Sequence, residues 1–115
     1  MSRESAVTTH VLDTARGVPA AGVAVRLELV SDTGQLPVGH SVTDADGRAR
    51  DLGPVLLPPG IYRLVYDTGA YFAARGIEPA FFPEVAVTFR VNGDVQHHHV
   101  PLLLSPFAYS TYRGS

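Results

Sequence analysis

The sequence predicts an all-β protein, an antiparallel β-sandwich of about eight strands with one short helix. Short segments that alternate apolar and polar side chains recur along the 115 residues. Gly, Pro, Asn and Asp separate these segments at intervals of roughly ten residues, as in sandwich proteins. Only one segment has a helical composition. A chain of this length is expected to form one domain, residues 1–115.

The first half of the chain contains three predicted strands. Residues 5–13 are rich in β-branched side chains, which favour strands. Residues 22–30 alternate apolar side chains with polar and charged ones, so one face of this strand is expected to be core. Residues 36–43 form the third predicted strand. The segment that follows, residues 44–48 (DADGR), is typical of a tight turn.

The second half adds the helix and more strands. Residues 60–68 alternate again, and the Ala-rich residues 70–75 are the helix candidate. Residues 84–91 form a cleanly alternating strand. The dipeptide Asn92-Gly93 is a strong hairpin signal, so we expect a hairpin whose return strand is residues 95–104.

The C-terminus follows two apolar runs. Residues 100–104 and 107–112 precede the last residues of the sequence, which end in YRGS (112–115). We therefore expect the tail to be tied to the sheet, close to the histidine run 97–99, rather than frayed as chain ends usually are.

Composition excludes several classes of function. The cations are nine arginines and no lysines, and with eleven carboxylates the net charge is −2, so no basic surface for nucleic acid is expected. There is no cysteine, which excludes disulfides, thiolate metal sites and cysteine nucleophiles. Chemistry would have to use His, Arg, carboxylate or hydroxyl groups.

No membrane association is expected from the sequence. No apolar stretch approaches the roughly 18 residues that a spanning helix needs, and the N-terminus lacks the apolar core of a signal peptide. We expect a soluble, cytoplasmic protein.

The histidines leave alternatives open. In a strand, His97 and His99 share a face while His98 points to the other side. A His-x-His pair can chelate zinc, but zinc needs a third ligand, for which His10 is the candidate. Each of these histidines can equally well lie on a solvated face of the sheet, and so can Arg48 at its turn.

Four motifs in order along the chain resemble one family. They are THVLD (9–13), DADGR (44–48), HVPLLLSP (99–106) and YRGS (112–115). Together they resemble the 5-hydroxyisourate hydrolases, the enzymatic branch of the transthyretin-related proteins. The resemblance covers nearly the whole chain, and YRGS is its most specific part, because the hormone-carrying transthyretins lack it.

The resemblance implies a transthyretin-like sandwich assembled as a homotetramer, with sites in a central channel between dimers. It implies hydrolysis of the six-membered ring of 5-hydroxyisourate, which yields 2-oxo-4-hydroxy-4-carboxy-5-ureidoimidazoline in urate degradation, a part of purine catabolism. No metal and no organic cofactor are implied.

The same resemblance implies the site residues. Its catalytic groups would be His10, Arg48, His99 and Ser115. The arginine would be Arg48 of the DADGR motif and not Arg50, which lies two residues later. His10 and Arg48 would also bind substrate, together with Tyr112. The resemblance does not imply a role for His97 or His98. The sequence differs slightly from the family pattern at Ala108, where glycine is common.

These residue types suit the reaction independently. Imidazole, with its ordinary pKa near 6.5, can take a proton from water near neutral pH, and either His10 or His99 could be that base. A guanidinium such as that of Arg48 can bind ring carbonyls and stabilise an oxyanion. The alternative from another class is a carrier that binds an aromatic ligand without turnover, since sandwich folds host both roles.

Overall fold

Nine strands and one helix are present in residues 4–115, the part of the chain that the computed structural model describes. In chain order they are β1 (Val7–Asp13), β2 (Val18–Pro19), β3 (Ala24–Ser31), β4 (Gly34–Val42), β5 (Arg48–Ala49), β6 (Gly60–Tyr66), α1 (Thr68–Ala73), β7 (Val85–Val91), β8 (His98–Ser105) and β9 (Ala108–Thr111). The short strands β2 and β5 were not predicted from the sequence, which placed turns and interruptions there.

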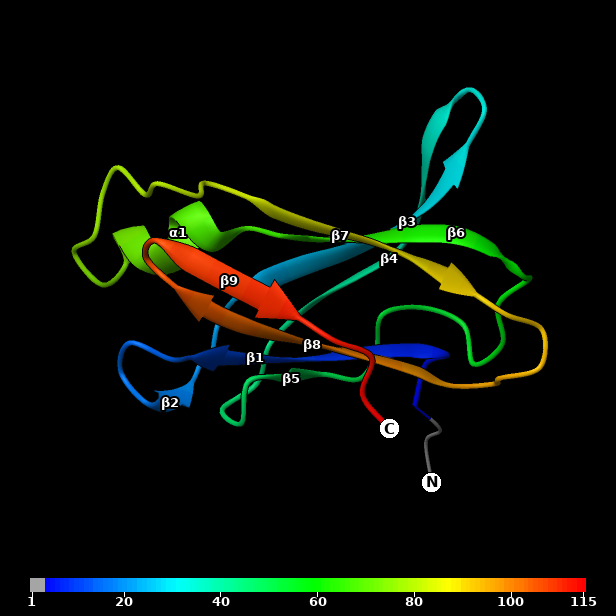
Figure 1. Ribbon diagram of the computed structural model, residues 1–115, viewed down its shortest axis with the longest axis horizontal. Coiled ribbons are helices and arrows are strands. Elements are labelled where there is room, and N and C mark those ends of the chain that lie inside the picture. The colour runs from blue at the N-terminus through cyan, green and yellow to red at the C-terminus, as the bar shows by residue number, and fades with distance from the viewer. Residues whose placement is uncertain (1–3) are drawn as a thin grey trace.

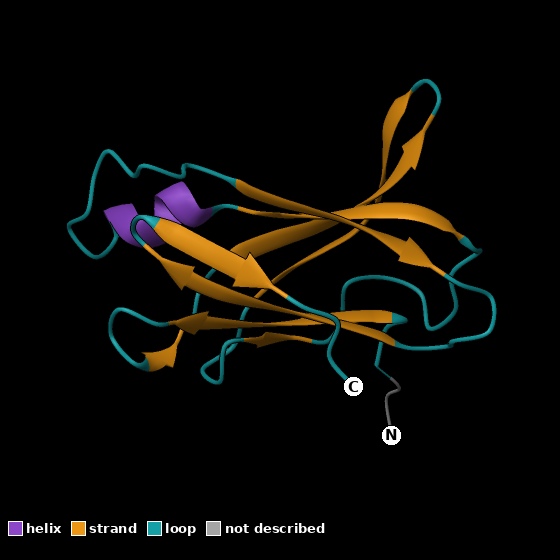
Figure 2. Ribbon diagram, in the orientation of Figure 1, coloured by secondary structure: helices purple, strands orange, loops and turns teal. Residues whose placement is uncertain are grey.

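The strands form two sheets that face each other (Figures 1 and 2). One sheet has the order β4-β3-β6-β7, and the other has the order β2-β1-β8-β9 with β5 also paired to β1. Because β8 pairs along the whole of β1, β2 and β5 share the opposite edge of that strand. The predicted two-sheet sandwich is confirmed.

One strand pair departs from the predicted antiparallel arrangement. β1 and β8 run parallel, with Val7 opposite His98 and Asp13 opposite Leu104. Parallel neighbours need a long crossover connection, and here the rest of the sandwich separates the two strands in the sequence. The parallel pair brings the N-terminal THVLD motif alongside the C-terminal HVPLLLSP motif.

The core lies between the sheets and follows the predicted alternation. Val25 and Leu27 of β3 are buried, as are Leu64 and Tyr66 of β6. Their partners across the core include Val11, Leu102 and Leu104 from β1 and β8, which are fully buried. In β1 and β8 the intervening residues therefore point away from the core, onto the outer face of the sheet.

The helix is displaced from its predicted position. It spans Thr68–Ala73 instead of residues 70–75, and the predicted strand before it ends at Tyr66. Asp67 causes both differences, because its side chain accepts a hydrogen bond from the N–H of Ala70 at 3.1 Å and caps the helix.

The predicted hairpin at Asn92-Gly93 is wrong. β7 pairs with β6 in one sheet, whereas β8 begins only at His98 and pairs with β1 and β9 in the other. A turn does form, since the N–H of Val95 donates to the Asn92 carbonyl at 3.3 Å. Gly93, however, is not among the described glycines with positive φ, so the turn lacks the type I′ geometry that joins paired strands. The connection instead crosses from one sheet to the other.

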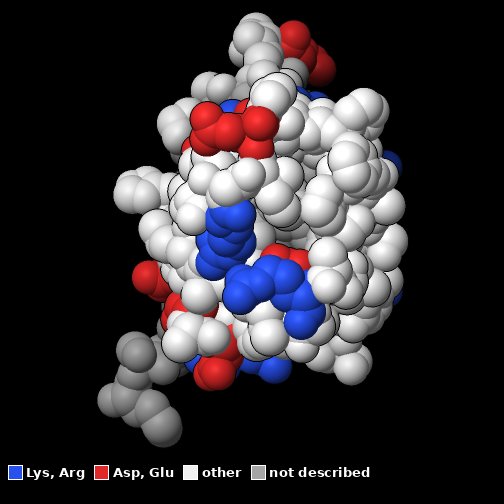
Figure 3. Space-filling view, turned by 90° about the vertical axis from the view of Figure 1, so that its left-hand side faces the viewer, with Lys and Arg blue, Asp and Glu red and all other residues white. Residues whose placement is uncertain are grey.

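The end of the molecule that carries α1 and the β1–β2 turn shows mixed charge. Arg16 and Arg75 line a hollow there together with Asp13. Figure 3 shows basic and acidic side chains side by side on this face, without a continuous basic surface across it. Across residues 4–115, no helix has the length and apolar character needed to cross a membrane.

Candidate active site

The outer face of the β1–β8 pair positions the candidate residues. The parallel register sets Thr8 of β1 opposite His99 of β8. On the other edge of β1, the antiparallel pairing with β5 sets His10 opposite Arg48. Because side chains alternate along a strand, Thr8 and His10 share this outer face. Backbone pairing alone thus gathers four polar side chains from distant parts of the sequence.

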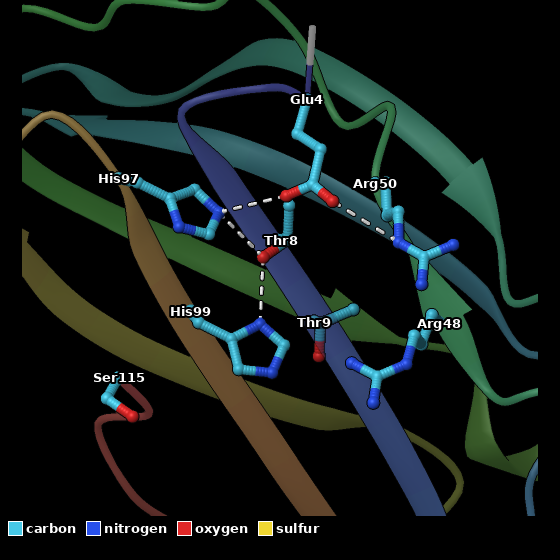
Figure 4. A pocket seen from close by; sticks show the side chains of 8 residues that line it. All are labelled: Glu4, Thr8, Thr9, Arg48, Arg50, His97, His99 and Ser115. Atoms are coloured by element: carbon cyan, nitrogen blue, oxygen red, sulfur yellow. Dashed lines mark hydrogen bonds and ion pairs between the residues drawn. The ribbon is translucent and has the colours of Figure 1, made fainter.

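A polar pocket of about 220 Å³ opens on this face. It is lined by Glu4, Thr8, Thr9, Arg48, Arg50, His97, His99 and Ser115. Figure 4 shows the rings of His97 and His99 on one side of Thr8 and the guanidinium groups of Arg48 and Arg50 on the other. Three of the predicted site residues, Arg48, His99 and Ser115, therefore share one pocket.

His99 is held from two sides. Its Nδ1 lies 2.8 Å from the Thr8 hydroxyl oxygen. The tail approaches from the other side, where the N–H of Gly114 donates to the His99 carbonyl at 2.8 Å and forms an isolated β-bridge. A Cβ atom at position 114 would lie 2.7 Å from Cδ2 of the His99 ring, so glycine is needed for this approach. The predicted attachment of the tail beside the histidines is confirmed.

The surroundings of His99 favour its neutral form. Burial lowers the pKa of the ring below its ordinary value of 6.5, and the nearby positive charge of Arg48 lowers it further. His97 and His10 act in the same direction, and Glu4 opposes them. A neutral imidazole is the form that can accept a proton near neutral pH.

The guanidinium of Arg48 is available for a ligand. The DADGR turn places it, because the carboxylate of Asp44 accepts the backbone N–H of Arg48 at 3.0 Å. Within residues 4–115, its guanidinium has no hydrogen bond or ion pair. Arg50, by contrast, pairs with Glu4 at 3.4 Å and with Asp44 at 3.8 Å. The two arginines thus differ in that, among the described residues, Arg50 is paired and Arg48 is not.

His10 stands beside the pocket and does not line it. Its Nε2 lies 2.9 Å from the carbonyl oxygen of Asp46. A carbonyl only accepts, so Nε2 carries a proton that it donates to this oxygen. The DADGR turn therefore positions both His10 and Arg48.

Tyr112 lies at a different hollow from the other predicted site residues. That hollow is mostly apolar, and it is lined from β7 by Phe89 and from the tail by Tyr112 and Arg113. His99 borders both hollows. In a single chain, then, His99 separates Tyr112 from Arg48.

His98 points away from the pocket, as the alternation predicted. It is buried, and its Nδ1 has no hydrogen-bond partner among the described residues. Burial lowers the pKa of this ring, and Arg113 and His97 lower it further.

Sequence reasoning missed five residues of the pocket, which are Glu4, Thr8, Thr9, Arg50 and His97. The Thr8 hydroxyl bridges the two histidine rings, lying 3.0 Å from Nε2 of His97 and 2.8 Å from Nδ1 of His99. Nε2 of His97 also lies 3.7 Å from a carboxylate oxygen of Glu4. The period of β1 would have indicated Thr8, because it shares a face with His10. The contribution of Glu4 depends on tertiary structure.

The sequence left open a zinc site formed by His97, His99 and His10. Within the described part of the chain, no three His, Asp or Glu side chains are grouped so that they could hold a metal ion. The zinc alternative with His97, His99 and His10 thus finds no ready-made ligand set.

Comparison with known proteins shows the family to which the chain belongs. The sequence model of the HIUase/Transthyretin family, in which HIUase denotes 5-hydroxyisourate hydrolase, matches residues 7–114. The chain is similar to the 5-hydroxyisourate hydrolase of Salmonella dublin, with 47% identity over 112 residues, covering 95% of this chain and 80% of that protein.

Two solved structures show the same fold. The 5-hydroxyisourate hydrolase of Klebsiella pneumoniae is 38% identical with a TM-score of 0.83, covering 96% of this chain and 99% of that one. Sea bream transthyretin in complex with thyroxine is 32% identical with a TM-score of 0.86, covering 95% and 94%. Both the matched region and these likenesses span nearly the whole chain, which therefore belongs to the HIUase/Transthyretin family.

Proposed function

We propose that the protein is a 5-hydroxyisourate hydrolase that opens the six-membered ring of its substrate to give 2-oxo-4-hydroxy-4-carboxy-5-ureidoimidazoline in urate degradation. Relatives that carry this name extend over nearly the whole chain. The observation that carries the proposal is the pocket where His99, unpaired Arg48 and the C-terminal Ser115 meet. A ring-opening hydrolase needs a proton-transfer group and a fixed cation at one place, and this pocket offers both.

In the proposed reaction, water attacks a ring carbonyl. The water oxygen bonds to the carbonyl carbon, the carbon–nitrogen bond of the ring breaks, and the ring nitrogen takes up a proton. His10 and His99 form the proton-handling pair, in which a neutral imidazole accepts a proton from water and the imidazolium so formed supplies that proton to nitrogen. General acid and base groups of this kind contribute roughly 100-fold or more to such reactions.

Arg48 is proposed to bind the ring carbonyls and the oxyanion of the tetrahedral intermediate. Its guanidinium has no competing partner within residues 4–115, so its donors are free for oxygen atoms of the substrate. Fixed donors aimed at a developing oxyanion are worth about 100- to 1,000-fold in rate. Ser115 is proposed as a further hydrogen-bonding group that orients substrate or water.

The site is proposed to be completed in a homotetramer. The pocket of one chain is open to solvent, and its volume of about 220 Å³ is below the roughly 300–1,000 Å³ of most small-molecule sites. A second copy facing it would close the pocket and could supply Tyr112, which lies apart from Arg48 within one chain. The cytoplasmic location expected from the sequence is part of the same proposal, and microscopy of a tagged chain in its own cell would test it.

The experiment is the ultraviolet decay of freshly generated 5-hydroxyisourate with and without purified protein. The substrate also decays unaided, so an accelerated rate that saturates with substrate concentration is the expected result. His99→Ala should lower kcat by about 100-fold, while His40→Ala, an exposed histidine of the other sheet, serves as the matched control. Wild-type protein that leaves the decay unchanged would refute the proposed activity.

The second candidate is a carrier of an aromatic ligand, favoured by the likeness to a transthyretin with bound thyroxine. The lining of the pocket argues against it, because two imidazoles and three other ionic side chains are poorly suited to an apolar ligand. Calorimetric titration with thyroxine tests this candidate. Tight binding together with unaccelerated 5-hydroxyisourate decay would favour the carrier.

A further inference from the structure

We propose that Thr8 is a positioning residue that holds the proton of His99 on Nε2, so that His99 is the hydrogen-bond donor of the site and His10 is its base. This inference rests on the proposed hydrolase function and assigns the two histidines different roles within it. The assignment follows from which atoms around the two rings can donate and which can only accept.

The first step concerns His97 and Glu4. The carboxylate of Glu4 forms an ion pair with the guanidinium of Arg50 at 3.4 Å. An ionised carboxylate only accepts hydrogen bonds, and a carboxylate oxygen of Glu4 lies 3.7 Å from Nε2 of His97. The proton of His97 is therefore favoured on Nε2, where it also faces the Thr8 hydroxyl oxygen at 3.0 Å.

The second step concerns the single hydroxyl hydrogen of Thr8. Because Thr8 accepts from His97, its own hydrogen is free to be donated to Nδ1 of His99 at 2.8 Å. A neutral imidazole that accepts at Nδ1 carries its proton on Nε2. His99 then offers an Nε2–H that donates a hydrogen bond to the substrate while the neutral ring keeps its proton.

The third step concerns His10. Its Nε2–H donates to the carbonyl of Asp46 at 2.9 Å, so whenever the ring carries a single proton its lone pair is on Nδ1. The two histidines therefore carry complementary protonation, one with a free acceptor and one with a free donor. With this pairing, His10 can accept a proton from water at Nδ1 and then pass it to the departing ring nitrogen, while His99 donates a hydrogen bond to the substrate.

The geometry of Thr8 is suited to this role. It is buried, with 2% exposure, although it lies on the outer face of the sheet, because the two imidazole rings cover it. The β1–β8 register sets it directly opposite His99. The charged and titratable groups that face His99 from neighbouring segments are Arg48, His97, His10 and Glu4.

The test is nitrogen-15 NMR of the histidine rings at a pH of about 7.5, with full-length protein and no substrate. In the wild type, we expect His99 and His10 each to show a protonated Nε2 and a bare Nδ1. Thr8→Val removes the hydroxyl at similar volume and should move His99 towards a mixture of tautomers, while Thr8→Ser should retain the wild-type signal. Thr14→Val, which removes a hydroxyl just beyond β1 that donates to the Leu104 carbonyl at 3.2 Å, is the control.

Kinetics supply the second readout. Thr8→Val should lower kcat by about 10-fold or more and change the pH profile of kcat, while Thr8→Ser restores both. A His99 proton on Nδ1 in the wild type would overturn the inference even if Thr8→Val fails to fold. A folded Thr8→Val protein in which His99 keeps the wild-type tautomer would also overturn the inference. The expected NMR result together with unaccelerated substrate decay would instead refute the hydrolase function and leave the positioning role intact.

Discussion

At the scale of single residues, the site depends on a few contacts that fix one imidazole ring. Thr8 bonds to Nδ1 of His99 on one side, and Gly114 packs against the opposite edge of the ring. Arg48 contributes positive charge without being paired within the described residues. The last residues of the sequence are therefore part of the site and not a frayed end.

Replacing Gly114 by Ala tests this close approach. An added Cβ would lie 2.7 Å from Cδ2 of His99, so either the ring or the tail must move. We expect kcat/KM for 5-hydroxyisourate to fall by about 10- to 100-fold, because small misplacements of a catalytic group are costly. The melting temperature should change little, since the tail contributes few buried contacts. Unchanged kcat/KM would show that the tail does not position His99.

Arg48 can be tested against Arg63, which lies on the other sheet and donates to Thr88 at 3.2 Å. Replacement of Arg48 by Ala should lower kcat/KM by about 100-fold or more, because it removes the oxyanion donor. The Arg63→Ala variant should retain wild-type kinetics. Equal losses in both variants would mean that Arg48 acts only through general stability.

At the scale of elements, a buried hydrogen bond joins α1 to the end of β1, the strand on which the site is built. The Tyr71 hydroxyl of α1 donates to the carboxylate of Asp13 at 2.7 Å, at the end of β1. Asp13 is 3% exposed, so its carboxylate relies on this bond and on the backbone N–H of Arg16. The guanidinium of Arg75 lies 3.6 Å from the centroid of the Tyr71 ring.

Tyr71→Phe should therefore destabilise the protein. The variant keeps the ring but leaves one buried carboxylate oxygen without its partner, which costs about 1–3 kcal/mol in free energy of unfolding. Urea denaturation of the variant and of Tyr109→Phe, an exposed tyrosine of β9, measures the difference. A loss no larger than that of Tyr109→Phe would show that the Asp13 bond does not stabilise the fold.

Alternation and turn residues predicted the strands well, because both are local properties. The faces of β3, β6 and β7 follow the period of two, and the DADGR turn occurs where its Asp and Gly residues indicate. Strand partners are not local, which is why the β7–β8 hairpin was wrong and the parallel β1–β8 pair was not foreseen. The same limit applies to the site: the family resemblance indicated Arg48, His99 and Ser115, and the period of β1 would have indicated Thr8, whereas Glu4 joins the pocket only through tertiary structure.

At the scale of the whole molecule, the fold keeps two histidine rings in surroundings that favour their neutral forms. Burial is the main cause of the lowered pKa of both His98 and His99, and nearby arginines add to it. In the unfolded chain both rings return to a pKa near 6.5. Between the folded and unfolded pKa values, the unfolded state binds more protons, so acid favours unfolding.

The free energy of unfolding should accordingly be pH-dependent on the acid side. The contribution of these rings is fully present above about pH 6.5 and is lost as pH falls through the lower folded pKa values. Denaturation curves between pH of about 7.5 and about 5.5 measure the slope, and His98→Phe should reduce it. A single transition is also expected, because residues 1–115 are predicted to form one domain. Stability that is constant over this range would contradict the assigned shifts.

The central claim is that the pocket on the outer face of the β1–β8 pair hydrolyses 5-hydroxyisourate. The most direct test is the initial rate of 5-hydroxyisourate loss, followed in the ultraviolet, with wild-type protein over a range of substrate concentrations. The account predicts a saturable rate well above spontaneous decay, which falls when His99 is replaced by Ala. A wild-type rate equal to spontaneous decay at every substrate concentration would contradict it.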